Sequence, residues 1–547
     1  TPLRSLSRNS RYLEITPRVG EHSFVEVRTP LAAQRTAEFH IEEPAIVDRY
    51  HLPVDPEQFD RATAVNLRSF KRPHMRIFHL AYLSGITGFI GWYAIPPLMP
   101  TIKTQLGLTD GEVLNSDIAS TASTIISRVA VGPLLDAYGP QAVQSTLLWF
   151  GAIPIISAAF VNSSITLLVV RFFVGLIGCV FVSGQYWTTI TFARNVAGTA
   201  NAINGGIGLA GIGFAFLLLP FINEFLTSVC NVSTDTAWRV TIVLPAALML
   251  IMGTVIRYVV DSCPMGAFEN LARAKQQLAE KTQTPKASLI QSFRIVLSDP
   301  NALIMIMHYG VCFGTELQLN NMGALYFYNS FLTRDDCTAA SEDESCHVLT
   351  KTNAAAVASA FGLMNLFARA LGGLASDTVN RRWGMTGRKC VQFTLLCVLG
   401  SLVLVLSRLD SLGPCIVLYV LVAIAAQATG GSTYGIVPYL NEQYTGTVNG
   451  LVGAGGNLGG VIYGIIFRAT PSYSSGLFIM AFIIYASALF VPLVRFKNAK
   501  IAQDTDVQEW RGREFSKQRQ SSELLLDELQ LEIDLRQQEE GPNVRAA

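Results

Sequence analysis

Long apolar stretches separated by short polar segments dominate the chain from residue 76 onward. Each stretch has roughly 20 residues, which is enough for an α-helix to cross a hydrocarbon core about 30 Å thick. The twelve stretches cover 76–99, 113–135, 142–162, 165–192, 198–226, 238–260, 301–331, 353–375, 389–408, 413–439, 447–468 and 474–496. The pattern predicts an all-α membrane protein with twelve transmembrane helices.

Polar segments divide this pattern into five predicted parts. The first is a polar, charge-mixed segment without a sustained apolar period, which favours a partly disordered cytoplasmic leader. The parts are the leader (1–72), an N-terminal six-helix bundle (73–260), a central cytoplasmic loop (261–299), a C-terminal six-helix bundle (300–497) and a cytoplasmic tail (498–547). Within the tail, 521–540 reads as an amphipathic helix that either holds a partner or covers a cytoplasmic face.

Composition agrees with a membrane protein. The 547 residues are 50% hydrophobic and 15% charged, whereas soluble domains have about 25% charged residues. The net charge of +1 gives no reason to expect nucleic-acid binding. The nine cysteines show no metal-type spacing, so neither a metal site nor a cofactor is predicted.

Lysine and arginine concentrate in alternate loops, which by the positive-inside rule places both termini in the cytoplasm. We expect the membrane to be the plasma membrane. Asn162 and Asn231 begin glycosylation-type tripeptides in loops assigned to the outside. Cys337 and Cys346 flank an acidic loop on the same side, where a disulfide is possible.

Two pairs of segments repeat along the chain. "SRVAVGPLLD" at 127–136 and "ARALGGLASD" at 368–377 each place an arginine eight residues before an aspartate. "GTANAINGGIGLAGI" at 198–212 resembles "GTVNGLVGAGGNLGG" at 446–460 at nearly the same offset. The offsets indicate two pseudo-symmetric bundles in the same orientation, a transporter plan with the substrate site at their interface.

The two repeated arginines, Arg128 and Arg369, are expected near the membrane centre. Asp136 and Asp377 open cytoplasmic loops, and eight residues at about 1.5 Å each place the arginines about 12 Å deeper. A guanidinium at that depth costs at least ~2.5–3.5 kcal/mol, so each should face an anion or a water-filled cavity. The alternative is a structural ion pair. Internal acids look scarce, with Glu316 the main candidate, and one glutamate cannot neutralise two arginines.

Two guanidinium forks, one from each bundle, suit a small, flat, delocalised oxyanion. Small residues let membrane helices pack closely, and glycines beside the arginines would also leave room for a ligand. Tyr309 and Phe313 lie four residues apart on one helical face. The candidate site residues beside the arginines are Phe181, Tyr309, Phe313, Gly205, Gly206, Gly455, Gly456 and the amide donor Asn457.

Several motifs carry a family resemblance over about 75–500. "GPLLDAYG" and "GGLASD…NRR" look like the loop motifs after helices two and eight in the major facilitator superfamily. "SRVAVGPLLDAYGP", "FVSGQYW", "FGTEL", "FGLMNLFARALGGLASD" and "GTVNGLVGAGGNLGG" resemble the nitrate/nitrite porter family of eukaryotic high-affinity nitrate transporters. The resemblance implies the major facilitator fold, with a loop motif at Asp136, Asp377 and Arg381 that takes part in gating.

The resemblance also implies a function. Arg128 and Arg369 would clamp nitrate, with Phe181, Tyr309 and Phe313 closing the site above and below. It implies proton-coupled nitrate uptake, or nitrate/nitrite exchange as in some bacterial members, and leaves an accessory subunit open.

The chain departs from the family at two places. The helix-five signature Gly-Trp-Gly-Asn is Gly206-Ile207-Gly208-Leu209 here, so the asparagine donor is present in helix eleven alone, and the basic residue after Asp136 is missing.

Proton carriers and rival functions stay open at this point. Glu316, His308 and His79 are the candidates for carrying protons. The alternatives to a nitrate importer are a transporter or exchanger of another small oxyanion, or a nitrate-binding membrane receptor. An enzyme is not expected, because the apolar segments contain no nucleophile–base pair or metal constellation.

Overall fold

The computed structural model describes residues 51–282, 289–333, 344–440 and 445–495. Residues 1–50, Cys337 and the amphipathic segment 521–540 lie outside the described residues. Cys346 is disulfide-bonded, in agreement with the disulfide considered from the sequence.

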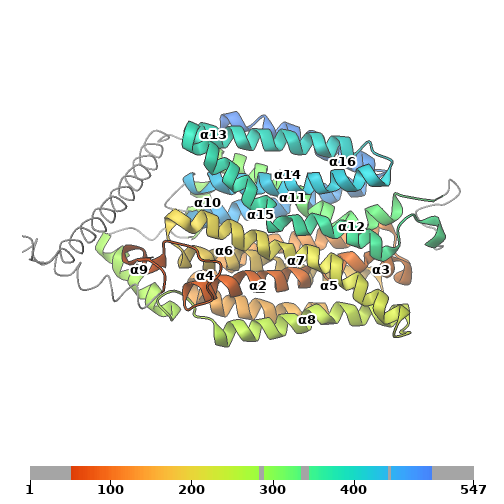
Figure 1. The fold of residues 1–547 in the computed structure, drawn as a ribbon, viewed down its shortest axis with the longest axis horizontal. Coiled ribbons are helices and arrows are strands. Elements are labelled where there is room, and N and C mark those ends of the chain that lie inside the picture. The colour runs from red at the N-terminus through yellow and green to blue at the C-terminus, as the bar shows by residue number, and fades with distance from the viewer. Residues whose placement is uncertain (1–50, 283–288, 334–343, 441–444, 496–547) are drawn as a thin grey trace, which may run out of the picture. The chain divides into compact units, whose positions relative to one another are not determined.

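Helices make up nearly all of the described chain (Figure 1). The first group is α2 (His74–Trp92), α3 (Met99–Leu106), α4 (Asp110–Ala158), α5 (Ser164–Gly175), α6 (Val180–Thr191), α7 (Arg194–Ser228) and α8 (Thr234–Val259). Two short helices follow, α9 (Phe268–Thr282) and α10 (Leu289–Leu297). The second group is α11 (Pro300–Asn329), α12 (Lys351–Leu363), α13 (Ala368–Leu406), α14 (Leu412–Ile436), α15 (Thr445–Ala469) and α16 (Tyr473–Ala488).

Ten helical segments of the described residues are long and apolar enough to cross a membrane, where twelve were predicted. The count differs because α4 holds two predicted spans in one element. The first predicted span corresponds to α2, which is not among the ten because His74, Arg76 and His79 make its first two turns polar. All twelve predicted stretches are therefore helical in the structure.

Side chains at the helix starts satisfy the free backbone N–H groups, and this explains where several helices begin. Thr109 and Glu112 form a capping box at the start of α4. Ser163 and Thr166 do the same for α5.

Two glycines turn the chain at the ends of long helices. Gly139 in α4 has φ 76° and ψ 162°, and Gly384 in α13 has φ 59° and ψ −152°. These positive φ values favour glycine because it lacks a Cβ. Each glycine follows one of the two repeated aspartates and separates two consecutive predicted spans.

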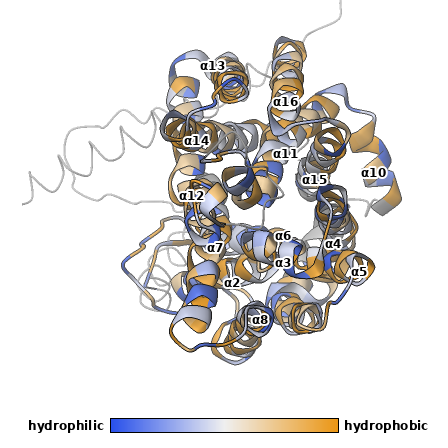
Figure 2. Ribbon diagram, turned by 90° about the vertical axis from the view of Figure 1, so that its right-hand side faces the viewer, coloured by the Kyte–Doolittle hydropathy of each residue, from blue (hydrophilic) through white to orange (hydrophobic). Residues whose placement is uncertain are grey.

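The helices of the two groups pack side by side (Figure 2). α7 contacts α12, and α4 contacts α15, so these two pairs join the groups. Large apolar side chains such as Phe150, Phe173 and Phe225 are exposed on the outer helix faces. Exposed apolar surface of this extent is typical of contact with lipid.

The last part of the predicted leader is ordered, although the sequence suggested partial disorder up to residue 72. β1 (Val54–Asp55) and β2 (Arg61–Ala62) form a small antiparallel hairpin. Ala62 forms an isolated β-bridge with Phe192, and both residues belong to a buried cluster that includes Phe78 of α2. The short apolar contacts of this hairpin have no periodic signal in the sequence, which is why the pattern missed them.

Candidate functional site

Arg128 extends from α4 toward the opposite group of helices. The residue is 2% exposed, and its Nη1 donates a hydrogen bond to the carbonyl oxygen of Gly453 in α15 at 3.0 Å. Its guanidinium carbon lies 5.3 Å from the ring centre of Phe181 and 5.4 Å from that of Phe313. The cation is therefore held by two aromatic rings and one backbone oxygen.

Arg369 lies in the first turn of α13 and is 4% exposed. Its Nη2 donates to Oε2 of Glu316 at 2.8 Å, and its Nη1 donates to the hydroxyl of Tyr309 at 3.4 Å. Its guanidinium carbon lies 5.8 Å from the ring centre of Phe313. The two predicted arginines thus approach the same aromatic ring from two helix groups.

Glu316 is fixed on both carboxylate oxygens. Oε1 accepts a hydrogen bond from Nδ2 of Asn365 at 2.6 Å, while Oε2 accepts from Arg369. The residue is 1% exposed. The structural pairing considered from the sequence is thus found for Arg369, and it uses the one glutamate at the site.

Arg128 has no such partner. Within the described ranges, no carboxylate lies within 4.0 Å of its guanidinium nitrogens, and its Nε and Nη2 are buried without a hydrogen bond. Two guanidiniums and one carboxylate leave this site with one excess positive charge. Because an unpaired buried charge is strongly destabilising, the arrangement is suited to receiving one negative charge.

Three aromatic side chains form one wall of the site. Tyr309 and Phe313 are stacked with ring centres 5.1 Å apart and planes 8° apart. Tyr434 of α14 meets Tyr309 edge-on at 5.0 Å. The predicted pair at four-residue spacing therefore does present both rings to the arginines, together with a tyrosine that the sequence did not single out.

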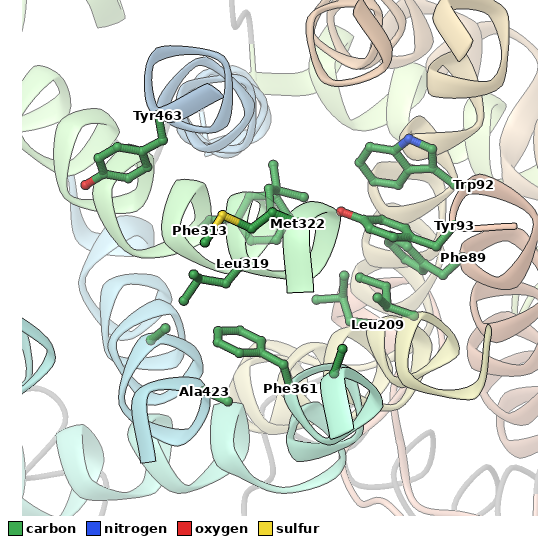
Figure 3. Close-up of a cluster of buried hydrophobic side chains, with 14 of the residues drawn as sticks. Phe89, Trp92, Tyr93, Leu209, Phe313, Leu319, Met322, Phe361, Ala423 and Tyr463 are labelled. Atoms are coloured by element: carbon green, nitrogen blue, oxygen red, sulfur yellow. The ribbon is translucent and has the colours of Figure 1, made fainter. Parts of the chain in front are cut away.

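Phe313 belongs to a large apolar cluster (Figure 3). The cluster has members from both helix groups, among them Phe89, Tyr93, Leu209, Met322 and Phe361. The cluster continues the contact between the two helix groups beyond the arginines.

Contacts between α4 and α15 extend from Arg128 toward the Asp110 end of α4. A Cβ added at Gly460 would lie 3.1 Å from Thr121, and one at Gly464 would lie 2.8 Å from Ile118. Glycine at these positions lets the two helices approach closely. The helix groups are therefore closed against each other on the side that the sequence assigns to the outside.

The predicted glycines lie at close helix or ring contacts. Added Cβ atoms would lie 3.2 Å from Phe181 at Gly205, 2.6 Å from the carbonyl oxygen of Asn365 at Gly206, and 2.7 Å from the rings of Tyr309 and Phe313 at Gly456. At Gly455 the nearest atom belongs to Ile306 of α11, 2.5 Å away. Three of the four thus adjoin residues of the arginine site, while Gly455 packs two helices together.

Asn457 is connected to the site through a shared acceptor. Its Nδ2 donates to the Gly453 carbonyl at 3.2 Å, the same oxygen that accepts from Arg128. Its Oδ1 is buried without a partner. Leu209, at the matching repeat position, is fully buried in the apolar cluster.

The two candidate histidines lie away from the arginines. His308 shares a hydrogen bond between its Nε2 and the carbonyl of Ser487 in α16 at 3.0 Å. His79 contacts the Ser69 carbonyl and the Tyr82 hydroxyl. Neither ring is among the contacts described for Arg128 or Arg369.

The loop-motif aspartates differ in their partners. Asp377 accepts from Nη1 of Arg388 at 2.6 Å, whereas Asp136 accepts from the hydroxyl of Tyr186 at 3.0 Å. The side chain of Arg381 lies outside the described residues.

Sequence reasoning missed a second buried ion pair, between Asp117 of α4 and Arg171 of α5. Each residue lies inside a predicted apolar span, which is the same signal that identified Arg128. The sequence analysis named Glu316 as the main internal acid, and Asp117 is a second one.

Comparison with known proteins places the chain among transporters. Residues 81–464 match the family model of the Major Facilitator Superfamily. "High affinity nitrate transporter 2.5" of Arabidopsis thaliana is 31% identical over 450 residues, which cover 82% of this chain and 84% of that protein. "Nitrate/nitrite transporter NrtP" of Picosynechococcus is 26% identical, covering 73% of this chain and 86% of that protein.

Two solved structures share the fold. A bacterial homolog of the human lysosomal transporter Spinster has a TM-score of 0.51 at 14% identity, covering 78% of this chain and 96% of that one. The nucleoside transporter NupG has a TM-score of 0.53 at 14% identity, covering 76% and 99%. Similarity at this identity supports the architecture alone.

Proposed function

The chain belongs to the Major Facilitator Superfamily, and within it to the nitrate/nitrite porter family of high-affinity nitrate transporters; from this premise we propose that it imports nitrate across its membrane. The observation that carries the proposal is the unmatched guanidinium of Arg128, buried beside a second arginine that a glutamate already neutralises. A site with one excess positive charge is complementary to a monovalent anion.

The shape of the site supports a flat oxyanion. The guanidinium fork presents coplanar N–H donors, and it matches the coplanar oxygens of nitrate better than a lysine ammonium would. The rings of Phe181 and Phe313 flank Arg128, and flat aromatic walls fit a planar ion. Nitrite carries the same charge and is expected as a weaker second substrate, because it offers one oxygen fewer.

We propose alternating access, and the place where the two helix groups meet supports it. The proposed binding residues come from both groups, and the groups touch on the side of Ile118 and Thr121. Nitrate between Arg128 and Arg369 would remove the excess positive charge at the interface. Bound nitrate would therefore lower the cost of closing both groups around the site, and an empty site would oppose it.

Uptake of an anion into a cell with a negative interior needs a second coupled species. The membrane potential opposes nitrate entry by ~2.3 kcal/mol per 100 mV. Proton symport supplies the missing driving force, and more than one proton per nitrate makes the cycle carry net positive charge inward. Of the candidates from the sequence, Glu316 is engaged as the counter-ion of Arg369, and His308 is turned toward α16, so neither is proposed as the proton carrier.

The proposed setting is the plasma membrane, with both termini in the cytoplasm. The positive-inside distribution of lysine and arginine supports this orientation. On this assignment the central segment that includes α9 and α10 is cytoplasmic. It connects the two proposed six-helix bundles, 73–260 and 300–497.

Uptake of isotopically labelled nitrate into proteoliposomes tests the proposal, with imposed pH and nitrite gradients. An acidic outside should drive nitrate inside the vesicles above its concentration at electrochemical equilibrium. A nitrite gradient alone should produce much less nitrate accumulation. Arg369→Lys should lose most of the uptake at normal expression, because the ammonium keeps the charge but lacks the planar fork. Normal uptake by this variant would remove the two-arginine clamp.

A further inference from the structure

A second buried ion pair lies in the N-terminal helix group, outside the arginine site. Asp117 of α4 and Arg171 of α5 are 4% and 2% exposed, and Arg171 Nη2 donates to Asp117 Oδ1. Close contacts hold the two helices at this level. Thr124 donates to the Gly175 carbonyl at 2.6 Å, and a Cβ at Gly175 would meet the Ser120 carbonyl oxygen.

This pair is incompletely bonded compared with Glu316 and Arg369. Among the described residues, Arg171 is the one hydrogen-bond donor to Asp117, and it reaches Oδ1. Nε and Nη1 of Arg171 are buried without partners. A pair that serves stability alone is expected to satisfy its remaining polar atoms, since a buried pair gains little otherwise. Asp117 therefore keeps one carboxylate oxygen available.

Tyr93 interacts electrostatically with residues of this pair and with residues of the arginine site. Its ring packs against Trp92 and Phe216, and its hydroxyl is buried without a hydrogen-bond partner. The interacting residues are Asp117 and Arg171 of the pair, and Arg128 and Glu316 of the arginine site. In Figure 3 the Tyr93 oxygen points toward Met322 and the α11 helix, away from α2.

We propose that Asp117 is the proton-binding group that couples nitrate import to the proton gradient, with Arg171 as its positioning residue. This inference rests on the proposed function. A proton from the outer side would bind Oδ2 and convert the carboxylate to a carboxylic acid, and its release to the cytoplasmic side would restore the carboxylate. The titratable or charged groups facing Asp117 are Arg171 of α5, Tyr93 after α2 and Tyr473 of α16.

Electrostatics supplies the coupling. Protonation adds one positive charge to the N-terminal group and leaves Arg171 without its counter-ion, while nitrate adds one negative charge beside Arg128. The two positions are eleven residues apart on α4, or about 16 Å along the helix. With an effective dielectric of about 20, each ligand should raise the affinity for the other roughly fivefold.

The test compares two transport modes in proteoliposomes containing the full chain. Asp117→Asn should reduce nitrate accumulation driven by a pH gradient at least tenfold. The same variant should keep nitrate–nitrate exchange at equal concentrations within about twofold of wild type, and that exchange should lose its dependence on pH. Asp110→Asn is the matched control, because Asp110 lies on the same helix in an exposed pair with Lys103. This control should change neither mode.

Three other results would each contradict one element of this proposal. Proton-driven accumulation by Asp117→Asn at the wild-type level would overturn the assignment. If Asp117→Asn lost accumulation and exchange to the same extent, the role of Asp117 would be structural. Recovery of proton-driven accumulation in Asp117→Asn/Arg171→Gln, which removes both charges, would show this most clearly. Failure of wild type to accumulate nitrate in response to a pH gradient would instead reject symport itself.

Discussion

The two repeated arginines occupy matching places in the sequence but differ in their surroundings. Arg369 donates to Glu316 and Tyr309, and Glu316 is held in turn by Asn365. Arg128 donates to a backbone carbonyl and lies against two aromatic rings. One helix group thus presents a neutralised, hydrogen-bonded fork, and the other presents an uncompensated cation.

This difference assigns separate roles to the two halves. The C-terminal group fixes the geometry of the site, because its arginine is oriented before any ligand arrives. The N-terminal group supplies the net charge that attracts an anion. A symmetric pair of free arginines would carry two positive charges and favour a dianion, so we propose that the single glutamate sets a preference for a monoanion.

The largest expected effect is the loss of nitrate uptake when either arginine is replaced, and a second substitution at Glu316 should distinguish the two arginines. Arg128→Gln and Arg369→Gln should each abolish nitrate uptake, the second because it leaves Glu316 as an unpaired buried anion. Adding Glu316→Gln should restore a minor part of the uptake to Arg369→Gln, because the double variant again has one net positive charge, although it still lacks the second guanidinium fork. The same addition to Arg128→Gln also restores one net positive charge, but it removes the carboxylate that orients Arg369, so uptake should recover less than in Arg369→Gln.

Uptake normalised to the amount of protein in the membrane measures this rescue. Equal recovery of both arginine variants, or of neither, would mean that the two cations are equivalent and that the asymmetry has no functional meaning.

Removing the glutamate alone should have the next largest effect. Glu316→Gln leaves two unpaired guanidiniums close to Phe313, and breaking a buried pair costs ~3–5 kcal/mol. Its Tm should fall by several degrees, and nitrate should raise the Tm of this variant more than that of wild type. Thermal unfolding with nitrate, against chloride as the control salt, measures both quantities; a Tm that does not change would contradict the charge argument.

The two loop-motif aspartates show a smaller version of the same asymmetry. Asp377 pairs with Arg388, while Asp136 accepts from the Tyr186 hydroxyl. A half-exposed ion pair contributes up to ~1 kcal/mol, so Asp377→Asn should change the nitrate exchange rate up to about fivefold. Asp136→Asn should change it less than about twofold. An equal or larger effect of Asp136→Asn would show that the loop motif of the N-terminal helix group contributes as much as that of the C-terminal group, although it lacks the basic residue after Asp136.

The smallest effect on transport is expected at Leu209, whose matching position in the second repeat is Asn457. Leu209 is fully buried in the apolar cluster, whereas Asn457 shares the Gly453 carbonyl with Arg128. Leu209→Asn should lower stability by ~1–3 kcal/mol through lost apolar burial. The KM for nitrate should change less than about threefold. A large gain in nitrate affinity would mean that the new amide reaches the anion.

Much of the fold could be predicted because membrane helices have a strong local signal. All twelve apolar stretches are helical, and the repeat offset identified Arg128 and Arg369 before any contact was known. The structure adds short 3₁₀ turns at Leu176–Cys179 and Met364–Leu366, directly before Phe181 and Arg369. These turns lie inside predicted transmembrane stretches, where no pattern of residue types distinguishes a 3₁₀ turn from an α-helix.

The partners of charged residues were harder to predict than their positions. Glu316 and Arg369 are 53 residues apart in sequence, and Asp117 and Arg171 are 54 residues apart. Which acid meets which base depends on helix packing and rotation, and neither quantity can be read from apolar periodicity. Asp117 itself had the same signal as Arg128, an ionisable residue inside a predicted span, and it needed no structure to be noticed.

Equilibrium binding of labelled nitrate to the purified protein tests the central claim most directly. Wild type should bind one nitrate per chain, and nitrite should displace it while sulfate does not. Arg128→Gln should weaken binding at least about a hundredfold, because it removes the unmatched buried charge. Wild-type affinity in Arg128→Gln, or displacement by sulfate as readily as by nitrite, would contradict the account.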